Sequence, residues 1–329
     1  MATDIVETAG PDTEKFAGAS LPRTAKRLFH ATRPKFFPAS VLPVLAGSAW
    51  GLQIAGQFDF VVFALALLAT VCVHAGANVL NDVGDDAGGT DRQNEDRIYP
   101  YTGGSRFIQV GIMSARGMAR LGISLLTIAA LAGLLLLTLK GEMILWFGLA
   151  GLLLAVLYSL GPVRLSSIGL GEIAVAAAFG VIPVTGAAWL QSGIIDANVI
   201  LFALPISAWV TAILLINEVP DIDADGSTGK KTLPVRVGLG GTAVLYVAIH
   251  AFAVAAVIWL VMRGGLPGVA AIVPVLLLLM GIKAAAAIRA GVNNNRAGMT
   301  GAIEATLGIH TLGSLWLAGC ALFAAFWGS

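Results

Sequence analysis

Nine stretches of this sequence contain no Asp, Glu, Lys or Arg, and each is long enough to cross a lipid bilayer as a helix, which takes about 20 apolar residues. The stretches are Phe36–Phe58, Phe60–Asn81, Leu121–Leu139, Met143–Val163, Ile173–Ile195, Ala197–Asn217, Val237–Met262, Gly264–Ile282 and Ala305–Ser329. Lipid offers no water to an exposed backbone, so a spanning segment must satisfy its own hydrogen bonds. The pattern therefore predicts an all-α membrane protein with nine transmembrane helices.

The composition excludes an ordinary soluble domain. Hydrophobic residues make up 57% of the chain and charged residues only 12%, against about 25% charged in typical soluble domains. The apolar stretches are also rich in Gly and Ala, which let helices pack closely in lipid.

Basic residues are concentrated on one side of the predicted topology. The N-terminal arm and the loops after the second, fourth, sixth and eighth stretches carry 18 of the 20 Lys and Arg residues, and the opposite side carries only Lys140 and Arg263. Basic loops stay cytoplasmic. We expect a cytoplasmic N-terminus, a C-terminus on the other side, and a site that faces the cytoplasm.

The N-terminal arm divides into two parts. Residues 1–20 include Asp4, Glu7, Asp12 and Glu14 without a continuous apolar core, so we expect a disordered tail and neither a secretory signal nor a transit peptide. Residues 21–329 form the predicted membrane domain. Its first segment, residues 21–37, mixes basic groups with aromatic residues, as interfacial segments do.

Two long polar loops, after the second and sixth stretches, open with the same N-x-x-x-D-x-x-x-D pattern. The two triplets are Asn78, Asp82 and Asp86, and Asn217, Asp221 and Asp225. Both stretches run towards the cytoplasm. We therefore expect two four-helix pseudo-repeats plus a ninth helix, with both triplets on the same side of the membrane.

The spacing of each triplet predicts a metal site. Positions i, i+4 and i+8 lie along one face of a helix end, so three oxygen ligands point the same way. Adjacent carboxylates near a bilayer need a cation, and Mg²⁺ commonly lies between carboxylates and substrate phosphates. We expect Mg²⁺ and a diphosphate here, with Asp85 as an additional ligand. The alternative is a pair of solvated acidic helix ends.

Basic side chains close to the triplets are candidates for holding phosphate oxygens. They are Lys35, Arg97, Arg106, Lys230 and Lys231. Anchoring on the cytoplasmic side is the competing explanation for each of them. His74, one turn before Asn78, is either a partner of a metal ligand or one half of an interhelical hydrogen bond.

The two loops and their flanks resemble the UbiA superfamily of intramembrane prenyltransferases, from about Arg33 to the ninth stretch. The matching segments are RPKFFPASVLPVLAG (33–47), NVLNDVGDDAGGTD (78–91), LYSLGPVRLSSIGLGE (157–172) and NEVPDIDADGSTGKKTLPVRVG (217–238). Within the superfamily, the segments look most like the 1,4-dihydroxy-2-naphthoate polyprenyltransferases of menaquinone synthesis. Gly89, Glu218 and Pro220 depart from the patterns of the aromatic-acceptor branches.

The resemblance implies an Mg²⁺-dependent transfer of a polyprenyl group from its diphosphate to an aromatic acceptor, in a membrane and without nucleic acid. Asp82, Asp221 and Asp225 would be catalytic. Tyr158 and Glu172 are candidates for contacting the acceptor; a membrane-interface Tyr and a helix-start carboxylate are the alternatives.

Other functions stay open at this point. The same chemistry would serve 4-hydroxybenzoate or a non-quinone acceptor. A cation transporter would place acidic residues near the middle of the membrane, where this chain has none. A CDP-alcohol phosphotransferase motif is not matched, because Ser227 and Thr228 follow Asp225-Gly226.

Overall fold

The structure, a computed structural model, describes residues 10–88, 97–159 and 164–327. Those residues contain helices and turns and no β-strand. The α-helices are α1 (Thr13–Phe16), α2 (Leu21–Ala31), α3 (Pro38–Ala55), α4 (Phe60–Gly88), α6 (Ala115–Lys140), α7 (Met143–Ser159), α8 (Gly171–Val175), α9 (Ile182–Ser192), α10 (Ala197–Asn217), α11 (Ile222–Ser227), α12 (Leu233–Met262), α13 (Ile272–Asn294) and α14 (Arg296–Trp327). Short 3₁₀ turns are η1 (Pro34–Phe36), η2 (Leu165–Ser167) and η4 (Gly268–Ala271), and η3 (Ala176–Val181) is a π-helical turn between α8 and α9.

Among the described residues, eight helical segments are long and apolar enough to cross a membrane. α7, the fourth predicted stretch, is apolar throughout but has 17 residues, which at 1.5 Å per residue span only about 25 Å. The expected number of nine is therefore not confirmed. The chain is an all-helical integral membrane protein.

Two segments differ from the sequence expectation. The helix that carries Asn78 and Asp82 continues to Gly88, so the first polar segment begins as helix rather than as loop.

The N-terminal tail was expected to cover residues 1–20, of which residues 1–9 lie outside the described part. Residues 10–20 include α1, capped by the Asp12 carboxylate, and its Phe16 is buried against Phe107. Phe16 helps to hold this arm on the bundle.

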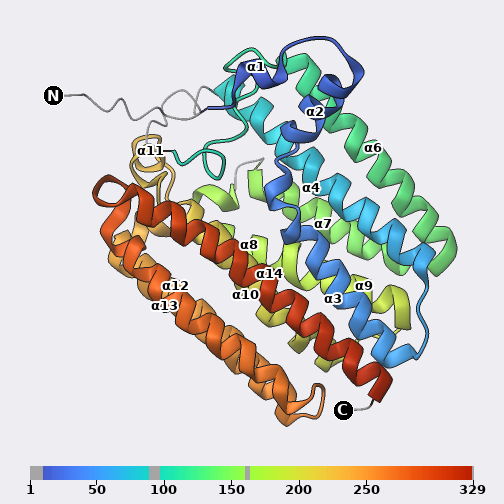
Figure 1. The fold of residues 1–329 in the computed structure, drawn as a ribbon. Helices are drawn as coiled ribbons and strands as arrows, with labels where there is room; N and C mark the ends of the chain where they lie inside the picture. Colours follow the sequence, from blue (N-terminus) through green and yellow to red (C-terminus); the bar gives the residue numbers. More distant parts are fainter. Residues whose placement is uncertain (1–9, 89–96, 160–163, 328–329) are drawn as a thin grey trace.

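The centre of the bundle is formed by α3, α9, α10 and α14. A buried cluster joins these helices with α12, and within it Trp50 of α3 stacks on Phe202 of α10 with ring centroids 4.6 Å apart. α4 packs along α6, and α12 packs between α10 and α13. α1, α2 and α11 lie at one end of the bundle and the C-terminus lies at the other (Figure 1).

Two glycines allow close approaches around this centre. A Cβ on Gly47 would lie 2.2 Å from the Val184 carbonyl oxygen, so α3 and α9 meet backbone to backbone. A Cβ on Gly180 would lie 1.9 Å from Ser207 Oγ, where η3 approaches α10. Small residues at such crossings replace the hydrophobic driving force that lipid cannot supply.

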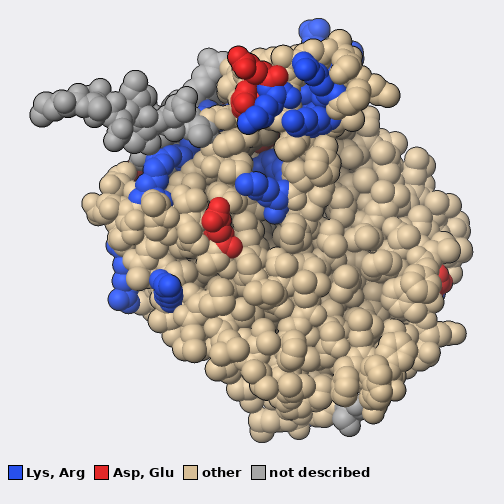
Figure 2. Space-filling model, in the orientation of Figure 1, with Lys and Arg blue, Asp and Glu red and all other residues tan. Residues whose placement is uncertain are grey.

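Charged side chains gather at the end of the bundle that carries α1, α2 and α11, while most of the remaining surface in this view has none (Figure 2). Large apolar side chains such as Leu131, Leu152 and Leu279 are exposed on the sides of the bundle. An apolar flank with a charged end is the surface that a bilayer requires.

We expect Gly47→Leu to destabilise the protein, because the side chain would meet the backbone of α9. Overpacking a tight contact typically costs about 1–3 kcal/mol. Thermal unfolding in detergent should therefore begin several degrees lower than in the wild-type protein. Gly151→Leu is the matched control, because nothing lies within 4 Å of a Cβ on Gly151 in α7. Equal melting temperatures for the two variants would contradict the proposed α3–α9 contact.

Candidate active site

The first acidic triplet lies on the last turns of α4. Asp82 is only 2% exposed, and its Oδ2 accepts a hydrogen bond from the Ser105 backbone N–H at 3.0 Å. Asp86 Oδ1 accepts one from the side-chain amide of Gln109 at 3.3 Å. The first loop therefore folds back over the end of α4 and contacts the carboxylates through its own polar groups.

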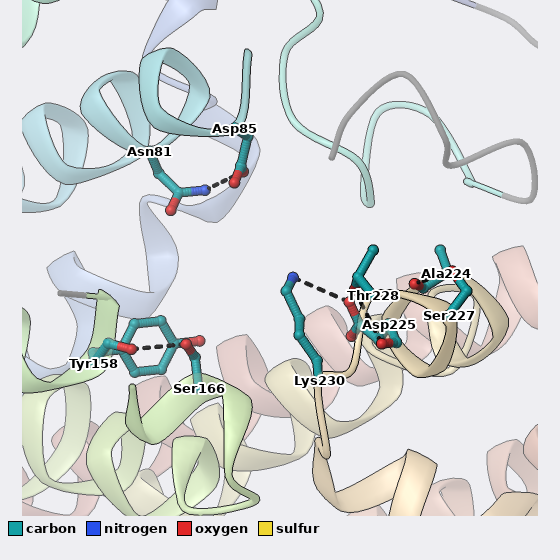
Figure 3. Close-up of polar contacts among 9 residues, drawn as sticks. All are labelled: Asn81, Asp85, Tyr158, Ser166, Ala224, Asp225, Ser227, Thr228 and Lys230. Carbon is teal, nitrogen blue, oxygen red and sulfur yellow. Dashed lines mark hydrogen bonds and ion pairs between the residues drawn. The ribbon is translucent and has the colours of Figure 1, made fainter. Parts of the chain in front are cut away.

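Two further residues of this segment have clear partners. The side-chain amide of Asn78 donates to the Thr32 carbonyl oxygen at 3.3 Å, which ties α4 to the end of α2. Asp85 Oδ2 accepts a hydrogen bond from the Asn81 amide at 2.8 Å, and the side chain points from α4 towards the side on which Lys230 lies (Figure 3). Asp85 lies one turn after Asp82 on α4, and the two carboxylates interact electrostatically.

The spacing rule predicted that the second triplet lies along one continuous helix. The structure instead places it on two helices with a turn between them. α10 ends at Asn217, the chain turns at Pro220, and α11 begins at Ile222. Proline lacks the N–H that a continuing helix needs, so the helix breaks there. Asp221 lies immediately before α11, and Asp225 lies within it and is 8% exposed.

Lys230 connects the two acidic segments. Its Nζ lies 3.1 Å from Asp225 Oδ1, and it faces the α4 carboxylates across the site (Figure 3). Burial disfavours the charged ammonium, but the carboxylates of Asp225, Asp85 and Asp221 outweigh it and raise the pKa of Lys230. A cation under the electrostatic influence of both segments means that they lie near each other in the fold.

Tyr158 and Glu172 lie beside the same carboxylates. Tyr158, near the end of α7, is within electrostatic reach of Glu218, Glu172 and Asp225. Its backbone carbonyl accepts a hydrogen bond from Ser166 at 2.7 Å (Figure 3), which fixes the end of α7 on η2. The structure therefore brings both candidate acceptor residues to the site. Leu160–Val163, part of the same connection, lies outside the described residues.

Glu218 is a residue of this site that the sequence analysis noted only as a departure from a pattern. Burial raises the pKa of Glu218, and the neighbouring Glu172 carboxyl, with which it shares a hydrogen bond, raises it further. A signal was available: Glu218 caps the C-terminus of α10, where the helix dipole disfavours a negative charge. A carboxylate at such a position indicates a role other than helix stability.

The predicted phosphate-binding residues occupy different environments. Arg106 is buried at 6% exposure with a φ of 63°, and its Nε donates to the Gly103 carbonyl oxygen. Lys35 is exposed, with its ammonium 4.7 Å from the centre of the Tyr101 ring.

The Lys231 backbone N–H donates to the Ser167 carbonyl oxygen at 2.8 Å, and the residue is exposed. The Arg97 backbone carbonyl accepts a hydrogen bond from Arg296. Lys230 forms an ion pair with Asp225 of the second triplet.

Arg33 is a cation that the sequence analysis had not selected. Its positive φ of 59° turns the chain between α2 and η1. Its guanidinium donates to the Tyr101 carbonyl oxygen at 3.4 Å and acts electrostatically on Asp85. His74, for its part, makes an interhelical hydrogen bond with Ser40 at 2.6 Å, the simpler of its two predicted roles.

The oxygen atoms of this site suit a hard divalent cation, although no three His, Cys, Asp or Glu residues in the described part of the chain already form a metal-binding group. Four buried oxygens have no hydrogen-bond partner: Asp82 Oδ1, Asn217 Oδ1, Glu172 Oε1 and Glu218 Oε2. Buried polar atoms without a partner are costly, and Mg²⁺ is bound by such oxygens. The donor set fits Mg²⁺.

The family model described as the UbiA prenyltransferase family matches residues 40–300 of this chain, a range that contains both acidic triplets. The chain belongs to the UbiA prenyltransferase family. It is therefore a prenyltransferase of the UbiA type. The match runs from α3 to the first turn of α14 and leaves out α1, α2 and the rest of α14.

Relatives with similar sequences carry a more specific name. The chain is 34% identical to a 1,4-dihydroxy-2-naphthoate octaprenyltransferase of Haemophilus influenzae, over 65% of this chain and 70% of that protein. A protein of the same name from Mycobacterium tuberculosis is 30% identical over 79% of this chain and 85% of that protein.

Solved UbiA structures share the fold. A UbiA homologue from Aeropyrum pernix superposes with a TM-score of 0.62 at 20% identity, covering 87% of this chain and 97% of that one. A homologue from Archaeoglobus fulgidus bound to GPP and Mg²⁺ superposes with a TM-score of 0.61 at 15% identity, covering 90% of this chain and 99% of that one. At these identities the likeness concerns the fold.

The Glu172–Glu218 pair gives this UbiA protein a pH-dependent stability in the absence of metal. Between the ordinary glutamate pKa of 4.5 and the raised pKa of Glu218, the folded protein holds a proton that the unfolded protein has released. Stability therefore falls as the pH rises through this range. We expect melting temperatures measured in detergent with EDTA to decline with pH, and Glu218→Gln to reduce the slope.

Glu14→Gln is the matched control, because Glu14 is exposed on α1 and should keep the wild-type slope. An unchanged slope in Glu218→Gln would contradict a shared proton between the two carboxyl groups.

Proposed function

We propose that this protein transfers a polyprenyl group from its diphosphate to an aromatic acceptor, with 1,4-dihydroxy-2-naphthoate as the acceptor, in menaquinone biosynthesis. The observation that carries the proposal is Lys230, held between carboxylates of α4 and α11 at one end of an apolar bundle. The site thus combines oxygen ligands for metal with a cation for phosphate. The names of the relatives support the choice of acceptor.

The two acidic triplets, with Asp85, would hold Mg²⁺ and through it the diphosphate. Asp82, Asp221 and Asp225 would be the essential ligands, and Asn78, Asp86 and Asn217 would complete the set. When bound, Mg²⁺ supplies positive charge that neutralises the charge developing on the leaving diphosphate. The structure of an Archaeoglobus fulgidus homologue with GPP and Mg²⁺ supports this use of the fold.

Lys230 would bind the diphosphate directly. In the structure it is paired with Asp225, so a metal that engages the Asp225 carboxylate would release the ammonium for phosphate oxygens. Arg106 lies next to Ser105, whose N–H contacts Asp82, and so stands at the same edge of the site. Lys35, Arg97 and Lys231 are the outer candidates, where screening by solvent weakens each contact.

The reaction begins when the allylic C–O bond breaks and its electron pair leaves with the diphosphate. The resulting allylic cation is attacked by an electron-rich ring carbon of the acceptor, and a new C–C bond forms. The ring regains aromaticity by losing a proton from the attacked carbon. With 1,4-dihydroxy-2-naphthoate, attack at the carbon that bears the ionised carboxylate would instead release carbon dioxide, and the electron pair of the broken C–C bond would return to the ring. Apolar walls exclude the water that would otherwise capture the cation.

Tyr158 and Glu172 would orient the acceptor. Glu172 is 6% exposed and its Oε1 has no partner, so it can accept a hydrogen bond from an acceptor hydroxyl. Glu218 lies beside it and would share this role. Glu172 lies in the first turn of α8 and Glu218 at the end of α10, and the acceptor ring would meet the allylic carbon beside them.

The topology proposed for the membrane has nine spanning helices, α7 included, and a cytoplasmic N-terminus. Supporting it, the charged end of the bundle in Figure 2 carries α1, α2 and α11, and basic residues favour the cytoplasmic side. The packing of α4 on α6 and of α10 on α12 supports two pseudo-repeats. The active site would then open to the cytoplasm, where a soluble acceptor is available.

Asp82→Ala and Asp221→Ala test the metal sites. We expect either variant to lose Mg²⁺-dependent prenyl transfer by about 10²-fold or more, because preorganised charge at a leaving group supplies effects of this size. Purified variants should keep the wild-type elution volume and helical circular dichroism.

Asp12→Ala, the same substitution at the exposed cap of α1, should keep full activity. Full activity of either Asp82→Ala or Asp221→Ala would refute the roles assigned to the triplets.

The acceptor is tested with purified protein, radiolabelled polyprenyl diphosphate and Mg²⁺. We expect a prenylated naphthalene product, with release of carbon dioxide, from 1,4-dihydroxy-2-naphthoate and little product from 4-hydroxybenzoate. If 4-hydroxybenzoate gave the faster turnover, the choice of acceptor would be wrong. The prenyltransferase chemistry would still stand.

A further inference from the structure

Helix α2 is amphipathic, but its apolar face does not pack against the protein. At 3.6 residues per turn, Leu21, Ala25, Leu28 and Phe29 fall within an arc of about 100°. Leu21 is 83%, Phe29 55% and Leu28 38% exposed, and Ala25 is exposed as well. A helix normally turns such a face towards a core, so these side chains require another partner.

The helix rests on the bundle through a different face. Ala31 is fully buried in a cluster with Phe16, Val79 and Phe107. Arg27 donates to the backbone carbonyls of Phe16 and Gly18, which fixes α1 on α2. The orientation of α2 is therefore set by the protein, and the apolar face is held outward.

The depth of this face matches the end of the membrane-spanning helices. Phe29 contacts Phe37 at the start of α3, with ring centroids 6.3 Å apart. Phe37 in turn contacts His74, one turn before Asn78 in the membrane-spanning part of α4. The apolar face of α2 thus lies beside residues that belong to the bilayer boundary.

The opposite face is basic. Arg23, Lys26, Arg27 and His30 occupy a second arc of about 100°. Between residues 10 and 33 the chain has five Lys and Arg residues against two acidic ones, Asp12 and Glu14, and Asp12 is paired with Lys15. Basic side chains flanking the apolar face of an in-plane helix attract anionic lipid headgroups.

We propose that α2 is an in-plane membrane anchor, with Leu21, Ala25, Leu28 and Phe29 inserted into the bilayer and the exposed Arg23 and Lys26 on anionic phospholipid headgroups. The anchor reaches the active site, because the Thr32 carbonyl that follows α2 accepts the hydrogen bond from Asn78. The anchor holds this carbonyl, and with it the first acidic triplet, at a fixed depth below the headgroups.

Spin labels on the whole protein test the insertion. Cys72 and Cys320 are both buried; in a Cys72→Ala/Cys320→Ala background, Leu28→Cys or Lys26→Cys would carry a nitroxide in proteoliposomes. These positions lie about 160° apart on the helix. We expect the label at 28 to collide several-fold more with oxygen, relative to a water-soluble nickel complex, than the label at 26. Equal or reversed ratios would overturn the anchor.

The preference of α2 for anionic lipid is tested by a second measurement on the same spin-labelled protein. The label at 28 should show a higher oxygen-to-nickel ratio in vesicles of phosphatidylcholine with phosphatidylglycerol than in phosphatidylcholine alone, and Arg23→Gln/Lys26→Gln should remove the difference. The same ratio in both lipids would refute the anionic partner. Dipolar broadening between labels at 28 would instead place a second copy of the chain on this face and also overturn the proposal. Neither measurement depends on prenyl transfer.

Discussion

The neutralisation of carboxylates gathered at one end of an apolar bundle is the constraint on which this structure depends. Asp82 and Asp225 are both more than nine-tenths buried, and Asp85 lies close to them. Within the described residues they are balanced by hydrogen bonds from Ser105 and Asn81 and by one ion pair with Lys230. Several oxygens still have no partner. Buried carboxylates are costly unless they are paired, and the proposed Mg²⁺ and diphosphate would supply the missing partners.

The fold places these groups by ending helices at the same level. α4 runs past its apolar part to present Asp82 and Asp85, while α10 stops at Asn217 and the chain restarts in α11 to present Asp225. One triplet is thus built on a continuous helix and the other on a break.

Much of the architecture could be predicted from the sequence, because apolar length and charge-free runs determine where a chain can cross lipid. The position of the site followed from the repeated pattern of Asn and Asp. The break at Pro220 was missed, since the i, i+4, i+8 rule assumed a continuous helix. Glu218 was missed because its importance comes from a neighbour 46 residues away in the chain, Glu172, and such pairs arise only from tertiary packing. Arg33 was passed over for a similar reason: its positive φ directs it to Tyr101 and Asp85.

The central claim is that the two acidic segments act as one site. A double-mutant cycle of Asp82→Asn and Asp221→Asn, read by Mg²⁺-dependent binding of an unreactive thio-analogue of a prenyl diphosphate, tests it most directly. If one metal–diphosphate unit needs both segments, each single variant should abolish most of the Mg²⁺-dependent affinity and the double variant should lose little more. Independent losses that simply add in free energy would contradict a shared site.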